Sequence, residues 1–154
     1  MMTNDINIPK VSEIEITYKP VIKPSEMLKV TCSKDAEKIF RSIWGNDITY
    51  RESFYALYLN RANKVLGYQL ISLSSIAGTV VDVRCIYQAA LKASASGIHN
   101  AHNHPSGNNE SSDADIKITK KLKDAGKLLD ITLLDHLILL PEGYISMADE
   151  GLLL

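Results

Sequence analysis

The segment GIHNAHNHPSGNNESSDADIKITKKLKDAGKLL, residues 97–129, contains three structural signals in a row. Residues 97–105 are typical of a short strand that ends at Pro105, because a proline favours an extended residue before it and cannot donate to a strand ladder. Residues 106–112 are polar and predict a loop. From Asp113 onward, apolar residues recur at helical spacing and predict a buried stripe made of Ala114, Ile118, Leu122, Ala125 and Leu129. The segment therefore predicts a strand, a loop and an amphipathic helix.

The flanking sequence adds further helices and strands on both sides of this unit. Ser33 is the expected cap of a helix that ends at Gly45, and Gly78-Thr79 is expected to break the chain before a second helix, which Gly97 ends. Strands alternate with these helices, and some of them form hairpins. This order predicts an α/β layered fold around a mixed sheet. The remaining expected elements are strands 52–60 and 64–73, antiparallel across an Arg61-Ala62-Asn63 turn, a helix within 81–96, and strands 130–140 and 144–147.

The first 30 residues differ in pattern from the rest of the chain. Three prolines interrupt them, at Pro9, Pro20 and Pro24. Residues 13–18 alternate apolar and polar side chains, which is compatible with a short edge strand. We therefore predict an N-terminal arm or linker over residues 1–30 and a compact domain over residues 31–154.

The composition is that of one ordinary globular domain. The chain has 154 residues and a net charge of −1, whereas proteins that bind nucleic acid through phosphate contacts usually carry a basic surplus. Cys32 and Cys85 are far apart in the sequence and are expected to be free thiols. We find no secretory signal and no apolar stretch long enough to cross a membrane, so we expect a soluble cytoplasmic protein.

Three of the four histidines lie within six positions of one another. Side chains alternate between the two faces of a strand, so His102 and His104 are expected on one face and His99 on the other. Two imidazoles at a strand end are a natural first half of a divalent-metal site. On its own the pattern is weak, because paired histidines on exposed strands are common without a metal.

Asp115 lies near the start of the next helix and could complete a His-His-Asp ligand set. Three protein ligands with one open position are typical of catalytic zinc rather than structural zinc. A purely structural interpretation also fits, because Ser112-x-x-Asp115 has the spacing of a capping box, in which the serine and the acid satisfy the free amides of a helix start. The two interpretations are compatible, since a residue held at a helix start can still present an oxygen outward.

A family resemblance follows from these residues. His102-x-His104, seven residues and then Ser112-x-x-Asp115 match the HxH-x7-SxxD signature of JAMM/MPN-type metalloproteases. The sequence HNHPSG, followed by SSDAD, resembles more narrowly the RadC family of bacterial proteins. The resemblance covers about residues 33 to 150. It also includes Glu52-Ser53-Phe54, Gly78-Thr79, Arg84 and Leu134-Asp135-His136.

The resemblance implies a fold and a role for each matching residue. The fold would be a three-layer α/β/α domain with a mixed sheet, in the cytidine-deaminase-like arrangement of JAB/MPN domains. His102, His104 and Asp115 would bind Zn²⁺. Ser112 would orient the water and help to stabilise the oxyanion, and Glu52 would act as general base and then general acid. From the residues alone, Glu52 is equally well explained as a solvated strand end.

Three departures from the family pattern stand out. The residue before Ser112 is usually a proline in the family but is Ser111 here, and His99 stands where an apolar residue is usual. We expect His99 to be hydrogen-bonded or partly exposed. The residues ahead of the domain are too few for the helix-hairpin-helix-like region of larger family members, which puts any DNA-binding property of that region in doubt. One of the adjacent Asp135 and His136 is expected to approach the site, although a buried histidine with a backbone partner is the slightly favoured interpretation of His136.

Three functions remain open at this point. The first is a zinc-dependent hydrolase of peptide or isopeptide bonds, with a protein or peptide as substrate. The alternative is a non-enzymatic DNA-repair or mobile-element accessory module, which the near-neutral charge does not support. The third is a zinc site that serves only as a scaffold for a protein partner. The sequence leaves the substrate and the oligomeric state undetermined.

Overall fold

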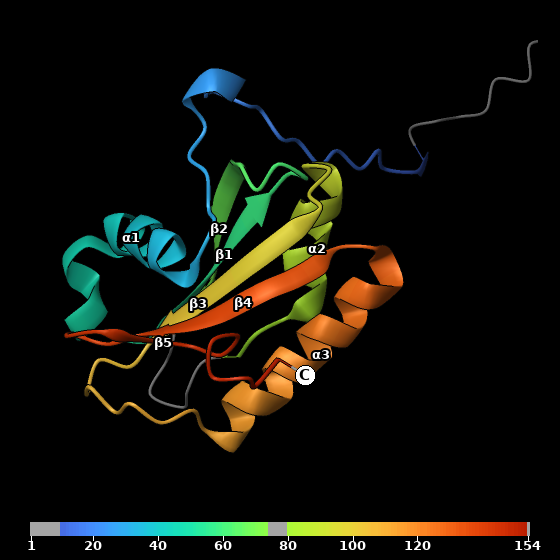
Figure 1. Ribbon diagram of the computed structural model, residues 1–154. Helices are drawn as coiled ribbons and strands as arrows, with labels where there is room; N and C mark the ends of the chain where they lie inside the picture. The colour runs from blue at the N-terminus through green and yellow to red at the C-terminus, as the bar shows by residue number, and fades with distance from the viewer. Residues whose placement is uncertain (1–9, 74–79, 154) are drawn as a thin grey trace, which may run out of the picture.

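The computed structural model describes residues 10–73 and 80–153, which form an α/β domain with a five-stranded mixed sheet (Figure 1). The strands lie in the order β2-β1-β3-β4-β5. In chain order the main elements are α1 (Ser33–Trp44), β1 (Ser53–Leu59), β2 (Val65–Leu73), α2 (Val83–Lys92), β3 (Gly97–Asn103), α3 (Asp113–Leu129), β4 (Thr132–Leu139) and β5 (Tyr144–Ser146).

The connections determine which strands run parallel. β1 pairs antiparallel with β2 and with β3, and β4 pairs antiparallel with β5. β3 and β4 are parallel neighbours, because the loop and α3 between them carry the chain back to the starting edge of the sheet. The loop that leaves β3 and the start of α3 therefore lie at the same end of the sheet (Figure 1).

Helices cover both faces of the sheet. α1 packs on one face, where Phe40 and Trp44 meet Leu57 of β1 and Leu137 of β4. α2 and α3 pack on the other face (Figure 1). There Ile86 and Leu122 meet apolar residues of β1 and β3, and the Tyr87 hydroxyl donates to the carbonyl of Leu122 at 2.5 Å. β1 lies between the two helical layers and is buried along almost its whole length, which fits its nearly continuous apolar sequence.

Most of the predicted elements are confirmed, with small differences at their ends. The hairpin of β1 and β2 and the helix from Asp113 to Leu129 form as expected. The cap of α1 was predicted wrongly: Ser33 is the first helical residue, and its hydroxyl donates to Asp149 instead of capping the helix. α2 ends at Lys92, and Gly97 opens β3 instead of stopping the helix. The predicted break at Gly78-Thr79 lies outside the described residues.

Two further predictions need correction. Residues 13–18 form no strand in the described chain, and Tyr18 is held there by a hydrogen bond from its hydroxyl to the carbonyl of Leu66. In the predicted stripe of α3, Ala114 and Leu129 are exposed. The other three residues of the stripe do pack in the core, Leu122 fully buried and Ile118 and Ala125 partly so, beside the buried Thr119 and Gly126. Among the described residues, no helix combines the length and the apolar character that a membrane crossing needs.

Candidate metal site

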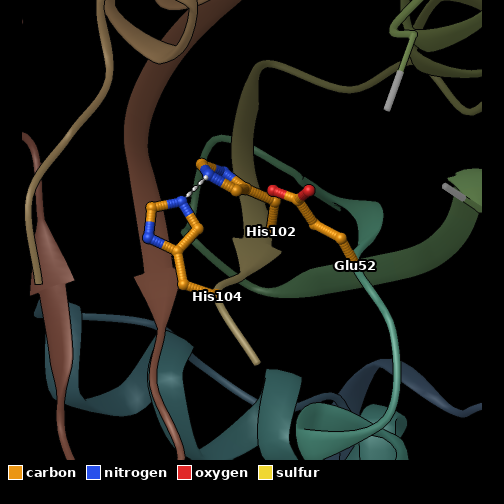
Figure 2. A group of neighbouring side chains, drawn as sticks. All are labelled: Glu52, His102 and His104. Atoms are coloured by element: carbon orange, nitrogen blue, oxygen red, sulfur yellow. Dashed lines mark hydrogen bonds between the residues drawn. The ribbon is translucent and has the colours of Figure 1, made fainter. Parts of the chain in front are cut away.

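The two motif histidines meet at the end of β3. His102 is the penultimate residue of the strand and is 3% exposed, on the face that carries α3. His104 follows the strand, where its backbone amide donates to the carbonyl of Leu139 at 2.9 Å. The two Nε2 atoms lie 3.0 Å apart (Figure 2). The predicted convergence of this pair is therefore present, with both ring nitrogens directed at one point.

Asp115 approaches the same point from the first turn of α3. Its Oδ1 lies 3.2 Å from His102 Nε2, and its Oδ2 lies 3.6 Å from His104 Nε2. The capping box is also formed: the Ser112 amide donates to Asp115 Oδ2 at 2.8 Å, and the Asp115 amide donates to Ser112 Oγ at 3.1 Å. The capping interpretation of the Ser112-x-x-Asp115 spacing is confirmed, and the cap holds the carboxylate so that it faces the imidazoles.

Glu52 lies on another side of the histidine pair. It immediately precedes β1, and its carboxylate points toward the His102 ring (Figure 2). Ligand atoms of Glu52, His102 and His104 all lie within 4.8 Å of one another, so this cluster could hold a metal ion. Asp115 contacts both imidazoles at shorter range than that limit. The pair of histidines is therefore flanked by two carboxylates from two different parts of the chain.

The donor set suits a small divalent ion. Two ligands about 2.05 Å from a tetrahedral zinc are separated by roughly 3.3 Å, and the observed separations of 3.0, 3.2 and 3.6 Å bracket that value. The outer nitrogen of His104, Nδ1, lies 2.8 Å from the carbonyl oxygen of Asn108. A carbonyl can only accept, so Nδ1 carries the hydrogen, and the Nε2 of a neutral His104 presents a lone pair to the centre of the cluster.

Electrostatics at the cluster favour a positive charge. The nearby Asp115 carboxylate raises the pKa of His104 above its ordinary value of 6.5. Burial acts to raise the pKa of the Asp115 carboxyl, but the nearby imidazoles of His102 and His104 outweigh it and hold that pKa well below its usual range. Asp115 is therefore ionised at neutral pH. It stabilises a proton on the His104 imidazole and would stabilise a metal ion in the place of that proton.

A cleft of about 360 Å³ opens beside the cluster. Its wall includes Glu52, His104, Ser112 and Asp115, so four of the five predicted site residues face the same space. His102, which is buried, does not line the cleft. The rest of the wall comes from the loop after β3. The cleft connects the two carboxylates and one imidazole with solvent.

Sequence reasoning misjudged one residue near the site and missed another. His136, for which a backbone partner was slightly favoured, instead places its Nε2 2.8 Å from His102 Nδ1. Thr119 was not singled out, yet its hydroxyl lies 2.6 Å from His136 Nδ1. The four-residue spacing from Asp115 to Thr119 places both on one face of α3 and is the signal that could have found Thr119. Asp135 faces the opposite side of the sheet, as expected for the neighbour of His136.

His99 lies on the opposite face of β3 from the motif histidines, as predicted. It was expected to be hydrogen-bonded or partly exposed. Instead it is 7% exposed, and its Nδ1 has no hydrogen-bond partner among the described residues. Burial lowers the pKa of its imidazole, and the nearby Asp135 opposes that effect. His99 is thus a neutral buried side chain and takes no part in the cluster.

The fold and the cluster define a class: an α/β domain with a mixed sheet and a His/His/Glu group that could bind a metal ion. Comparison with known families places the chain more narrowly. The model of the RadC-like JAB domain matches residues 30–152. The chain therefore belongs to the RadC-like JAB domain family, in agreement with the resemblance found in its sequence.

Curated relatives carry the name UPF0758 protein. One from Flavobacterium johnsoniae is 45% identical over 127 residues, which are 82% of this chain and 55% of the relative. One from Listeria monocytogenes is 34% identical over an alignment of 155 positions, which covers 97% of this chain and 68% of the relative. One from Methanosarcina mazei is 40% identical over 101 residues, 66% of this chain and 44% of the relative. The chain spans about half the length of the first of these proteins.

Proposed function

We propose that this chain is a zinc-dependent hydrolase of peptide or isopeptide bonds, a metallopeptidase of the JAMM type. One observation carries the proposal. Two imidazole nitrogens and a partly buried carboxylate face one another at the separations of zinc ligands, beside an open cleft that a second carboxylate enters. The sheet with helices on both faces is compatible with the cytidine-deaminase-like arrangement that we assign to this domain.

Within this proposal, the two carboxylates have different roles. Asp115 is the third zinc ligand, because it contacts both imidazoles and is held in place by the capping box. Glu52 comes from the segment before β1, which is not part of the capping box, and it lies in the wall of the cleft. A ligand needs a fixed position, whereas a proton carrier has to reach both the attacking water and the leaving group. This difference supports Asp115 as ligand and Glu52 as general base.

The steps at the protein side chains follow from these positions. Zinc, when bound, supplies a Lewis acid for a carbonyl oxygen and lowers the pKa of water to about 7. The Glu52 carboxylate takes a proton from the attacking water and returns it to the leaving amine. Ser112 Oγ accepts from the Asp115 amide, which leaves its own hydrogen free to donate to the oxyanion that develops on the substrate carbonyl. Both groups line the same cleft, so one bound amide can meet both.

The test compares zinc-loaded wild type with Glu52→Gln on a library of peptides and lysine-linked isopeptides. Glu110→Gln is the matched control, because Glu110 lines the same cleft and has no proposed role. We expect wild type and the control to cleave the same bonds, and Glu52→Gln to retain zinc and lose cleavage. Equal cleavage by Glu52→Gln would overturn the assigned base. Zinc binding without cleavage by any of the three proteins would favour a scaffold role.

A further inference from the structure

We propose that His136 and Thr119 are positioning residues that hold His102 in the one tautomer able to bind a metal ion. The inference rests on the cation site proposed above and extends it to two residues that do not touch the ion. Three contacts form a continuous chain between His102 and the backbone of Asp115. His102 Nδ1 lies 2.8 Å from His136 Nε2, His136 Nδ1 lies 2.6 Å from Thr119 Oγ1, and Thr119 Oγ1 lies 2.6 Å from the carbonyl oxygen of Asp115.

The carbonyl at the end of this chain sets the direction of its hydrogen bonds. A carbonyl oxygen only accepts, so the Thr119 hydroxyl donates its single hydrogen to Asp115. The sulfur of Met147, 3.4 Å from the hydroxyl, is also only an acceptor, so the direction is the same if the hydrogen is shared. Thr119 Oγ1 therefore accepts from His136, and the hydrogen of His136 lies on its Nδ1.

The same reasoning then passes through His136 to His102. A neutral imidazole carries one hydrogen, so the Nε2 of His136 accepts, and the Nδ1 of His102 has to donate to it. The Nε2 of a neutral His102 is then left with its lone pair. That lone pair faces His104 Nε2 and Asp115 Oδ1, where the proposed ion would lie. The opposite tautomer of His102 would place a hydrogen there and exclude the ion.

Burial of the two rings fixes the directions of these hydrogen bonds. His136 is fully buried, with the Phe54 ring at a centroid distance of 5.3 Å, and a charged imidazolium is unfavourable in such a place. His102 is almost as deeply buried. Water therefore cannot replace the protein partners, and the tautomer of each ring is set by its neighbour. Because Asp115 and Thr119 lie one turn apart on α3, this helix supplies Asp115 as one proposed ligand and, through Thr119, orients His102 as another.

The first test uses the metal-free wild-type protein and ¹⁵N NMR of the imidazole nitrogens, which distinguishes a protonated Nδ1 from a protonated Nε2. We expect His102 and His136 both to carry their hydrogen on Nδ1. A hydrogen on Nε2 of His136, or of neutral His102, would overturn the inference. The measurement needs neither zinc nor a substrate, so its outcome does not depend on the success or failure of the proposed hydrolase function.

The second test compares Thr119→Val, which removes the hydroxyl and keeps the branched shape, with Thr119→Ser, which keeps the hydroxyl. Zinc affinity is measured by competition with a chromogenic chelator. We expect about 10–100-fold weaker binding for Thr119→Val together with a mixed His136 tautomer, as for other losses of a ligand's supporting hydrogen bond. Thr119→Ser should restore most of the affinity. Thr132→Val, at an exposed threonine, is the control.

A merely structural role for Thr119 gives a different pattern of results. Thr119→Val would then unfold at a lower temperature, with the His136 tautomer and the zinc affinity of the folded protein unchanged. That result would contradict the inference. If Thr119→Val fails to fold, the wild-type NMR measurement decides alone.

Discussion

The pH dependence of zinc binding should show the competition between a metal ion and a proton at the histidine pair. In the metal-free protein, the nearby Asp115 carboxylate raises the pKa of His104 above 6.5. This raised pKa stabilises the folded metal-free protein below about pH 6.5, and the contribution disappears as the pH rises through the folded pKa. Zinc needs the lone pair that this proton occupies, so binding has to release it.

The expected size of the effect follows from one proton. Below the pKa of His104, the apparent Kd for zinc should fall about tenfold, or about 1.4 kcal/mol, for each unit of pH increase. Above that pKa the dependence on this group should end. Asp115→Asn removes the charge that raises the pKa, so the break in the curve should move to lower pH, toward 6.5. The overall affinity of this variant should also be weaker, because a proposed ligand is lost.

Isothermal titration calorimetry in buffers of different ionisation enthalpy measures both the affinity and the protons released. NMR titration of His104 in the metal-free protein gives its pKa without zinc. Asp113→Asn is the matched control, because Asp113 is also an acid in the first turn of α3 but is exposed and has no contact with the histidines. A zinc affinity that does not change between pH 5.5 and 8 would refute the reasoning, as would equal His104 shifts in Asp113→Asn and Asp115→Asn.

Three further predictions test other parts of the account. Glu52→Gln should bind zinc as tightly as Glu110→Gln and lose about 10²–10⁴-fold in turnover, and equal turnover would contradict the assigned base. Gly126→Ala should lower the free energy of unfolding by about 1–3 kcal/mol despite the better helix propensity of alanine, because an added Cβ would lie 2.2 Å from the Ile131 carbonyl oxygen. Chemical denaturation measures this change. An unchanged or higher free energy of unfolding would contradict the close packing at Gly126. Burial lowers the pKa of His99, so its contribution to stability is present above pH 6.5 and decreases as the pH falls below that value. His99→Leu should therefore flatten the plot of unfolding free energy against pH below 6.5. An unchanged slope there would contradict a lowered pKa for His99.

The proposed metal site could be predicted from the sequence to the extent that it depends on local spacing. His102 and His104 are two residues apart at a strand end, and Asp115 is three residues from the serine that caps its helix. These spacings place the side chains on one face whatever the tertiary structure is, because the periods of the strand and the helix determine them. Glu52 could be assigned only through the family resemblance, since its approach depends on the pairing of β1 with β3.

The supporting residues were harder to find because they depend on tertiary register. His136 reaches His102 only because β4 lies parallel to β3 with Asn100 opposite His136. Thr119 completes the contact because α3 packs over that pair. The end of α2 was predicted too late for a related reason: the alanine- and serine-rich residues after Lys92 permit a helix, but the chain has to turn there to enter β3.

The most direct measurement is a crystal structure of the zinc-loaded chain with anomalous diffraction at the zinc edge. The account predicts one anomalous peak within about 2.0–2.2 Å of His102 Nε2, His104 Nε2 and an Asp115 carboxylate oxygen, with a fourth position open to the cleft beside Glu52. A chain that binds no zinc, or a peak that Asp115 does not reach, would contradict it.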